Sequence, residues 1–509
     1  MKLGLITFGI TYLLGSCVTN TPTQPPDTHL PPAYRGTTAA TSASLADVPW
    51  KELYPDPILE DLVAKALTRN LTAQAAYATV LAAQQNVIIT HANELPAVQA
   101  TLQTPYQAVV GGKPALTPGG AFAPELALAA SYQIDVFGRL RSSTDASRAQ
   151  LLATQAGYET VLWTLVSQVA SAYFQLRELD AVEDLTHKTA ALRAENLRLV
   201  KLRVQFGEAS LQDQRQAEQS LLSVTKSLPL IRQSIEQTEN TLSILDGEYP
   251  HDISRGLPLK DQVALPLLPP AGIPSQLLVR RPDIIQAEET LVAADAQIDV
   301  ARKLLYPSFN FGVSAAAQGT LTTGVAPGLP KILSGINGVS GVFYGPYGVF
   351  AILPQVTQLI FNGGAPQARV RAAQAQQQQA ALSYAQTVLQ AFEEVANGVV
   401  AYNQQRLTRA QDQLYEAASL DSTRLAHLRY EEGQTSFLEV LDAESRSYQA
   451  QVDTEQALLN ERLALVQLYL ALGGGWQTQA RPTPAPGTTA GSQPPSGASA
   501  PQPTSSASR

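Results

Sequence analysis

The sequence predicts a mixed α/β membrane protein built from two tandem copies of one unit, with four β-strands and several long α-helices in each chain. Three observations predict this fold class. The first is an internal repeat, the second is a set of segments in which apolar and polar residues alternate, and the third is a pair of proline-free stretches of 68 and 66 residues, at 139–206 and 367–432.

The repeat is visible in the segments RLVKLR at 198–203 and RLAHLR at 424–429, which are separated by 424 − 198 = 226 residues. The same separation relates three pairs of glycines: Gly138 and Gly364, Gly207 and Gly433, Gly247 and Gly473. Farther upstream the separation is 211, so the second unit carries an insertion of 226 − 211 = 15 residues. We assign the two repeats to residues 50–247 and 280–475, joined by an inter-repeat segment at 248–279.

The N-terminus predicts export and lipidation. Residues 1–16 are typical of a signal peptide, because the apolar run after Lys2 is too short for a membrane helix of about 20 residues. The run ends at Leu14-Gly15-Ser16-Cys17, which resembles a bacterial lipobox and contains the single cysteine of the chain. We expect cleavage before Cys17 and acylation, with palmitate as a typical chain; the alternative is an ordinary signal peptide beside a chance cysteine. Residues 17–49 then predict a lipid-anchored linker, and residues 476–509, rich in proline and serine, a disordered tail.

Each unit has the same predicted order of a helical stretch, a β-hairpin, a very long helix, a glycine turn and a returning helix. The helical stretch, hairpin, long helix and returning helix lie at 57–94, 97–134, 139–206 and 209–246 in the first unit, and at 283–305, 308–358, 367–432 and 435–472 in the second. Pro282 suits a helix start, where its missing N–H costs nothing. At 1.5 Å per residue each long helix spans about 100 Å, so its apolar stripes need partner helices.

The hairpins predict strands with one apolar face. In the first return strand that face carries five residues: Leu126, Leu128, Ala130, Tyr132 and Ile134. Four such strands cannot close a barrel, which needs about eight, and an open edge in lipid leaves unpaired backbone groups. Shared closure is therefore expected, and three chains would give a trimeric twelve-stranded β-barrel. The alternative is a soluble helical lipoprotein with two β-hairpins packed on it.

Composition excludes several function classes. The formal net charge is −8 and no Lys/Arg cluster occurs, so we expect no nucleic-acid partner. One cysteine excludes an internal disulfide and a cysteine-based zinc site. No Gly-x-Ser-x-Gly, Walker-type or His-Glu-x-x-His motif occurs, so we expect no enzyme activity, no cofactor and no metal.

Over about residues 50–475 the sequence resembles the TolC-type outer-membrane efflux channels, most closely their lipidated NodT/OprM-like branch. The resemblance rests on the lipobox, the duplication and four motifs: LLVRRPDI at 277–284, YPSF at 306–309, FNGG at 361–364 and the turn at 433–442. It implies a homotrimer whose barrel continues into a periplasmic α-helical tunnel, located in the cell outer membrane. It also implies a passive exit duct for small molecules such as drugs and toxic compounds, working with a periplasmic adaptor protein and an inner-membrane RND-type pump. The alternative is a periplasmic coiled-coil structural lipoprotein without channel activity.

The same resemblance implies the functional residues. Tyr430, Glu439, Asp442 and Asp213 match positions of the family's periplasmic aperture, and Thr435 stands where the best-studied pattern has an arginine, which leaves a tethering salt bridge in doubt. Threefold symmetry would place six carboxylates around the axis and favour cations; the alternative is that Glu439 and Asp442 are solvated surface charges. The turns at Gly207 and Gly433 are the expected adaptor-docking sites.

Overall fold

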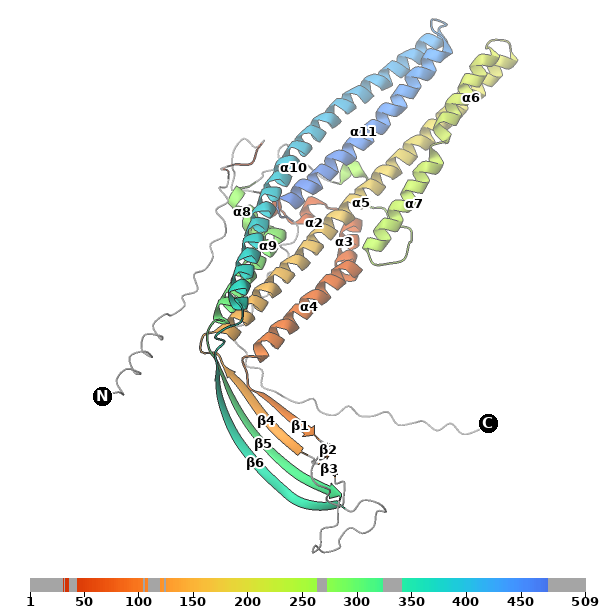
Figure 1. Ribbon diagram of the computed structural model, residues 1–509. Coiled ribbons are helices and arrows are strands. Elements are labelled where there is room, and N and C mark those ends of the chain that lie inside the picture. The colour runs from red at the N-terminus through yellow and green to blue at the C-terminus, as the bar shows by residue number, and fades with distance from the viewer. Residues whose placement is uncertain are drawn as a thin grey trace, which may run out of the picture.

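The computed structural model describes residues 31, 33–35, 44–103, 106–108, 120–122, 125–262, 272–323 and 341–474. The protomer is elongated, with a β-sheet at one end and two helical hairpins at the other (Figure 1). Between these ends, helices from both repeats lie side by side along the long axis. Cys17, the predicted signal peptide and the predicted tail at 476–509 lie outside the described residues.

The sheet is antiparallel and has two free edges. Its four main strands are β1 (Ala97–Gln103), β4 (Glu125–Ile134), β5 (Ser308–Thr323) and β6 (Gly341–Thr357). They pair in the order β1-β4-β5-β6, and two short strands, β2 (Tyr106–Ala108) and β3 (Gly120–Phe122), extend the first hairpin along β5. Both hairpins are thus confirmed. In the described part of the sheet, β1 and β6 each have an edge without a partner strand.

The strand register places the predicted apolar residues on one face. Leu128 lies opposite Ala100 of β1 and Ala315 of β5, which in turn lies opposite Phe350 of β6. Because side chains alternate along a strand, residues two positions apart share this face. Several of its side chains are more than half exposed in the single chain: Val98, Leu102, Leu126, Leu128, Phe350, Ile352 and Val356. The alternation in the sequence therefore corresponds to a sheet with a continuous apolar surface.

The helices form one layer with a constant neighbour order. Next to the sheet, α4 (Leu71–Ala92), α5 (Arg139–Gln205), α9 (Pro282–Lys303) and α10 (Ala365–Glu431) pack in that order. Farther from the sheet, one side of α5 packs against α7 (Leu228–Leu245) and then α6 (Leu211–Thr225). Its other side packs against α11 (Phe437–Ala471), and α11 packs on α10. The layer therefore has α10 at one edge along its full length, and α4 followed by α7 and α6 at the other. No helix among the described residues is long and apolar enough to cross a membrane.

The duplication is visible in the backbone. The three glycine pairs that share the separation of 226 residues all adopt the left-handed region, with φ of 72° and 82° at Gly138 and Gly364, and 78° and 73° at Gly207 and Gly433. Gly247 and Gly473 have φ of 75° and 76°. The first pair precedes α5 and α10, the second ends them, and the third follows α7 and α11. Equivalent turns thus occur at equivalent places in both units.

Two predicted helices are broken in the structure. The returning helix expected at 209–246 consists of α6 and α7, which are separated at Lys226 and Ser227. Pro229 at the start of α7 explains the break, because proline lacks an N–H and disfavours helical geometry in the residue before it. The stretch expected at 57–94 is divided into α3 (Pro57–Arg69) and α4 by Asn70, whose side chain caps α4 and also donates to the Leu245 carbonyl (2.9 Å).

Part of the predicted linker at 17–49 is packed against the helices. Tyr34, Leu45 and Ala46 are buried in the main hydrophobic core, and Leu45–Asp47 forms a short 3₁₀ helix, η1, whose first turn is capped by Ser44. The linker prediction was therefore wrong for these residues, because an average composition conceals single large apolar side chains that can be buried. The inter-repeat segment likewise contains η2 (Leu259–Asp261) and α8 (Pro274–Arg280).

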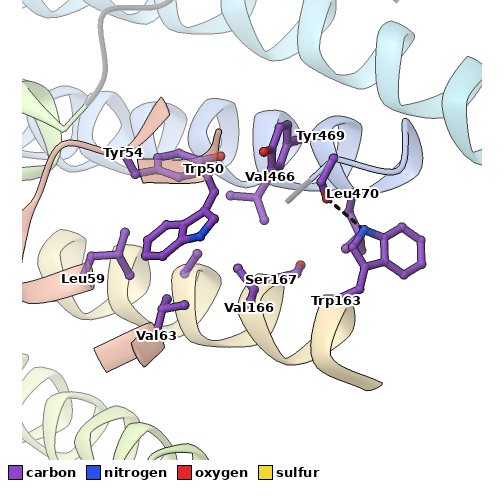
Figure 2. A pocket seen from close by; sticks show the side chains of 12 residues that line it. Trp50, Tyr54, Leu59, Val63, Trp163, Val166, Ser167, Val466, Tyr469 and Leu470 are labelled. Carbon is purple, nitrogen blue, oxygen red and sulfur yellow. Dashed lines mark hydrogen bonds between the residues drawn. The ribbon is translucent and has the colours of Figure 1, made fainter. Parts of the chain in front are cut away.

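The main core lies midway along the helices, where α2 (Trp50–Leu53) and α3 pack against α5, α10 and α11. A cavity of about 20 Å³ lies there, lined among others by Trp50, Trp163 and Tyr469 (Figure 2). Trp163 Nε1 donates to the Gly474 carbonyl at 3.1 Å. Its size is about that of one water molecule. The cavity is thus a small packing defect between aromatic side chains and has no room for an organic substrate.

Candidate aperture at the helix tips

The two helical hairpins end in the same type of glycine turn. At the first tip Glu208 N–H donates to the Arg203 carbonyl, and at the second Gln434 N–H donates to the Arg429 carbonyl, both at 2.8 Å. These bonds are typical of the Schellman motif that ends many helices. The motif requires a residue in the left-handed conformation, and Gly207 and Gly433 provide it. A Cβ at either glycine would meet no atom within 4 Å. Both turns are therefore exposed at the end of the molecule, where Figure 1 places them.

An apolar cluster holds the two tips together within one protomer. It joins α5, α6, α10 and α11 through seven buried side chains: Leu197, Val200, Ala217, Ala426, Phe437, Val440 and Ala443. Tyr430 packs against this cluster, with its ring 5.4 Å from that of Phe437 and the Arg203 guanidinium 5.3 Å from its centroid. The structure thus places Tyr430 at the contact between the two hairpins.

Glu439 and Asp442 both lie on the exposed side of α11, with side chains that are 50 % and 55 % exposed. Glu439 lies 3.2 Å from Arg429 of α10 and accepts a hydrogen bond from the Thr435 hydroxyl. Asp442 lies 2.8 Å from Arg446, one turn along α11. Each of the two carboxylates predicted to line the aperture therefore has an arginine of the same hairpin beside it.

Asp213 has a structural role in the other hairpin. Its carboxylate accepts hydrogen bonds from the Ser210 N–H (2.9 Å) and hydroxyl (2.7 Å), while the Ser210 hydroxyl accepts from the Asp213 N–H (3.1 Å). This reciprocal pair caps the N-terminus of α6 and satisfies donors that the helix leaves unpaired. The structure thus brings Tyr430 and Glu439 to the same tip, with Asp442 about one turn farther along α11 toward the sheet. Asp213 lies at the neighbouring tip.

Sequence reasoning missed a set of polar contacts between α5, α10 and α11, called the polar joint below, which consists of Asn196, His427 and Glu444 and lies on the sheet side of the tips. Glu444 of α11 accepts from Asn196 Nδ2 of α5 (2.7 Å) and lies 3.0 Å from His427 Nε2 of α10. Nearby, the Thr186 and Tyr448 hydroxyls lie 3.0 Å apart across α5 and α11. The only available signal was the Ala-Glu pair that the repeat places at 217–218 and at 443–444. Glu218 is exposed and pairs with Arg215, so the repeat alone could not distinguish a joint from a surface charge.

The arginine of the Arg-Arg-Pro-Asp motif has a packing role. Arg281 is buried and lies 2.6 Å from Asp283 and 2.7 Å from Glu394 of α10. Its guanidinium also donates to the Ala471 carbonyl (3.1 Å) and stacks over the ring of Trp163 at 5.2 Å. One side chain thus joins α5, α9, α10 and α11 at the level of the main core.

A polar groove lies between residues 283–294 of α9 and residues 376–390 of α10. Its volume is about 590 Å³, and it is lined mainly by uncharged polar side chains, including Gln286, Thr290, Gln376, Gln379 and Ser383. No group of three or more His, Cys, Asp or Glu residues in the described part of the chain is arranged to hold a metal ion.

The comparisons with known proteins agree on one family. The family model described as outer membrane efflux protein matches residues 62–248 and 273–474. The probable efflux pump outer membrane protein TtgC of Pseudomonas putida is 31 % identical over 496 residues, which cover 94 % of this chain and 97 % of TtgC. The cation efflux system protein CusC of Escherichia coli is 29 % identical over 432 residues, 84 % of this chain and 88 % of CusC. Among solved structures, the open state of the MtrE outer membrane channel of Neisseria gonorrhoeae matches with a TM-score of 0.76 and 30 % identity, covering 89 % of this chain and 97 % of that chain.

Proposed function

The chain belongs to the outer membrane efflux protein family and is the outer-membrane channel component of an efflux system, and we propose that three copies form one passive exit duct for small molecules. In this proposal the sheets of three chains close one barrel, and their helical layers close one tunnel that extends into the periplasm. Its role is transport, without a catalytic step.

One observation carries this proposal: the sheet and the helical layer are both open on the same two sides. Among the described elements, the edges without a partner are β1 and β6 in the sheet, and α4 and α10 in the layer beside it. Unpaired strand edges in lipid cost several kcal/mol per backbone group, so they need a partner. Both edge helices also expose large apolar side chains, with examples at Tyr77, Ile88, Leu382, Leu389 and Leu414. A second copy placed edge to edge covers all of these surfaces at once.

Three copies are favoured over two because the eight strands of a dimer would enclose an interior that side chains fill. The twelve strands of a trimer leave a wider interior, and twelve is an even number of the kind found in outer-membrane barrels. The apolar face that includes Leu128 and Phe350 would then contact lipid. The opposite face, with Gln99, Ser131 and Asn310, would face the channel. This division between an apolar exterior and a polar interior is the arrangement of membrane β-barrels.

The proposed partners are a periplasmic adaptor and an inner-membrane RND-type pump, with the exposed tips at Gly207 and Gly433 as the docking sites for the adaptor. The relatives are named for toluene, antibiotic, pyoverdine and cation efflux. Such different cargoes within one family support a duct that accepts what the pump delivers. We further propose that Cys17 is lipidated and anchors the chain to the outer membrane.

Planar bilayers test the proposal. Purified trimers inserted into a bilayer should produce discrete conductance steps of one unit size. A periplasmic structural lipoprotein without channel activity, the alternative reading of the sequence, would leave the bilayer silent. The proposed aperture depends on this result, since without conductance there is no aperture to control.

A further inference from the structure

The polar groove between α9 and α10 lies on one particular face of the helical layer. On α10, the ring of Phe392 packs against that of Tyr34, with centroids 5.6 Å apart. Ser383 precedes Phe392 by 392 − 383 = 9 residues, and at about 100° per residue it lies on the opposite side of α10. Gln376 and Gln379, which line the groove together with Ser383, lie within about 40° of it around the helix. The α10 wall of the groove therefore faces away from Tyr34.

The α9 wall has the same orientation. A Cβ added to Gly157 of α5 would lie 3.2 Å from the side-chain amide of Gln286, which lines the groove. Val166 follows Gly157 by 166 − 157 = 9 residues and lies on the opposite side of α5. There it lines the small cavity together with Trp50 of α2 (Figure 2). The groove is thus on the face of the layer opposite to the one on which Tyr34 and α2 pack.

In the proposed trimer this face lines the duct. The chain leads back from Tyr34 to Cys17, and an acyl chain on Cys17 has to lie in the membrane outside the barrel. The face of the layer that carries Tyr34 is therefore the outer face of the tunnel. The groove on the opposite face opens into the lumen, and threefold symmetry places three such grooves around the axis.

The groove presents uncharged hydrogen-bonding groups. Residues 372–392 of α10 contain no Asp, Glu, Lys or Arg over a length of about 30 Å. Gln286, Gln376 and Gln379 are exposed in the single chain, so their amides are accessible to a solute. Each amide offers two N–H donors and one acceptor oxygen. The lining can therefore both donate to and accept from a bound molecule.

The size and the charge of the groove limit what it can bind. Its volume of about 590 Å³ lies within the range of about 300–1,000 Å³ that is typical of small-molecule sites. Asp283 is the one charged residue in its lining, and it lies 2.6 Å from Arg281. A charged solute thus meets no unpaired opposite charge that could offset the water it loses. The lining favours a neutral solute.

We propose that this groove is a weak binding subsite for uncharged cargo molecules that carry several hydroxyl or amide groups; the subsite rests on the channel function proposed above. Hydroxyl and amide groups match the glutamine side chains because both partners donate and accept hydrogen bonds. A molecule bound in the groove occupies part of the lumen. Binding should therefore appear as a transient reduction of the ion current.

Maltotriose, a neutral trisaccharide, is the probe. Added to purified full-length trimers in planar bilayers, it should cause transient current reductions in the wild type. Gln376→Ala combined with Gln379→Ala should raise the apparent dissociation constant about tenfold, because two hydrogen-bonding side chains are lost. Equal current reductions in the wild type and this variant would overturn the subsite.

Gln374→Ala combined with Gln378→Ala is the matched control on the same stretch of α10. Gln374 precedes Phe392 by 392 − 374 = 18 residues, which is five full turns, and Gln378 lies within about 40° of the same side. Neither residue lines the groove. This control should bind maltotriose as the wild type does, and a loss equal to that of the groove variant would contradict the assignment.

Saturation-transfer NMR of maltotriose with detergent-solubilised trimers measures binding without conductance. Transfer should occur in the wild type and the control and should be lost in the variant of Gln376 and Gln379. Absence of transfer in the wild type would overturn the subsite, and so would equally tight binding of trigalacturonate, a trisaccharide that carries carboxylates. A silent bilayer would contradict the channel function instead, and the NMR result would still decide whether the groove binds neutral solutes.

Discussion

Asp442, one of the residues predicted to line the aperture, forms an ion pair of 2.8 Å with Arg446 along one face of α11. Together with the pair between Glu439 and Arg429, it means that each carboxylate assigned to the aperture has a cation of the same hairpin beside it. All four side chains are at least half exposed, so water and salt screen these pairs. The selectivity of the aperture therefore depends on the balance of the two signs as well as on the number of carboxylates.

This balance predicts opposite effects of two sets of variants. Glu439→Gln combined with Asp442→Asn should lower the cation over anion permeability ratio, because a fixed anionic ring raises the local cation concentration. Arg446→Gln should raise the same ratio. Both effects should decrease from 0.1 M to 1 M salt, as the Debye length falls from about 10 Å to about 3 Å. Reversal potentials in asymmetric salt are the measurement.

Asp184→Asn combined with Asp421→Asn is the control, since both carboxylates are exposed and paired along their own helix. If the Glu439 and Asp442 variant keeps wild-type reversal potentials at low salt, the pair does not line the aperture.

Two glycines with the same backbone conformation should differ in their tolerance of alanine. Gly207 and Gly247 have φ of 78° and 75°, but a Cβ at Gly207 would meet nothing within 4 Å, whereas at Gly247 it would lie 2.4 Å from the Arg69 carbonyl oxygen. Gly207→Ala should therefore cost about 1–2 kcal/mol for left-handed geometry alone. Gly247→Ala should cost clearly more, because backbone must move. Thermal unfolding of the detergent-solubilised protein compares them, and equal losses would refute the clash.

Glu178 predicts a pH dependence of stability. Burial raises the pKa of this α5 carboxyl to about 7, with a smaller contribution from Glu455 of α11. The neutral form is therefore favoured in the folded state, so the stabilisation is complete below the ordinary pKa of about 4.5 and is lost as pH rises to about 7. Glu178→Gln should flatten the stability curve between pH 5 and 7.5 and make the protein more stable than the wild type at pH 7.5. Thermal unfolding across this range gives the answer; a variant that retains the wild-type slope would exclude Glu178 as the cause.

Cys17 predicts the processing of the N-terminus. Cys17→Ala should abolish incorporation of labelled fatty acid and leave an unprocessed precursor, because the thiol is the acceptor of the lipid. The mature wild-type chain should begin with an acylated Cys17 by mass spectrometry. Fatty-acid labelling of the variant at the wild-type level would show that the lipobox interpretation is wrong.

The sequence predicted the fold where the physical signal is local and repeated. Proline-free stretches determine α5 and α10 almost to the residue, and alternation determines the face of the sheet that carries Leu128. The sequence-based prediction failed where one residue determines the structure against the average composition of its segment. Pro229 divides the returning helix, and Tyr34 is buried although its segment has the composition of a linker. The joint of Asn196, His427 and Glu444 could not be predicted, because it depends on the relative rotation of three helices, and amphipathic periodicity leaves that rotation undetermined.

The central claim is that three chains share one barrel, because the edges at β1 and β6 of a single chain have no partner strand in the described sheet. Native mass spectrometry of the protein extracted in mild detergent tests this claim most directly. We expect a particle of three chains, with no folded monomer that shows the full β-signal. A stable monomer with protected strand amides in detergent would contradict it.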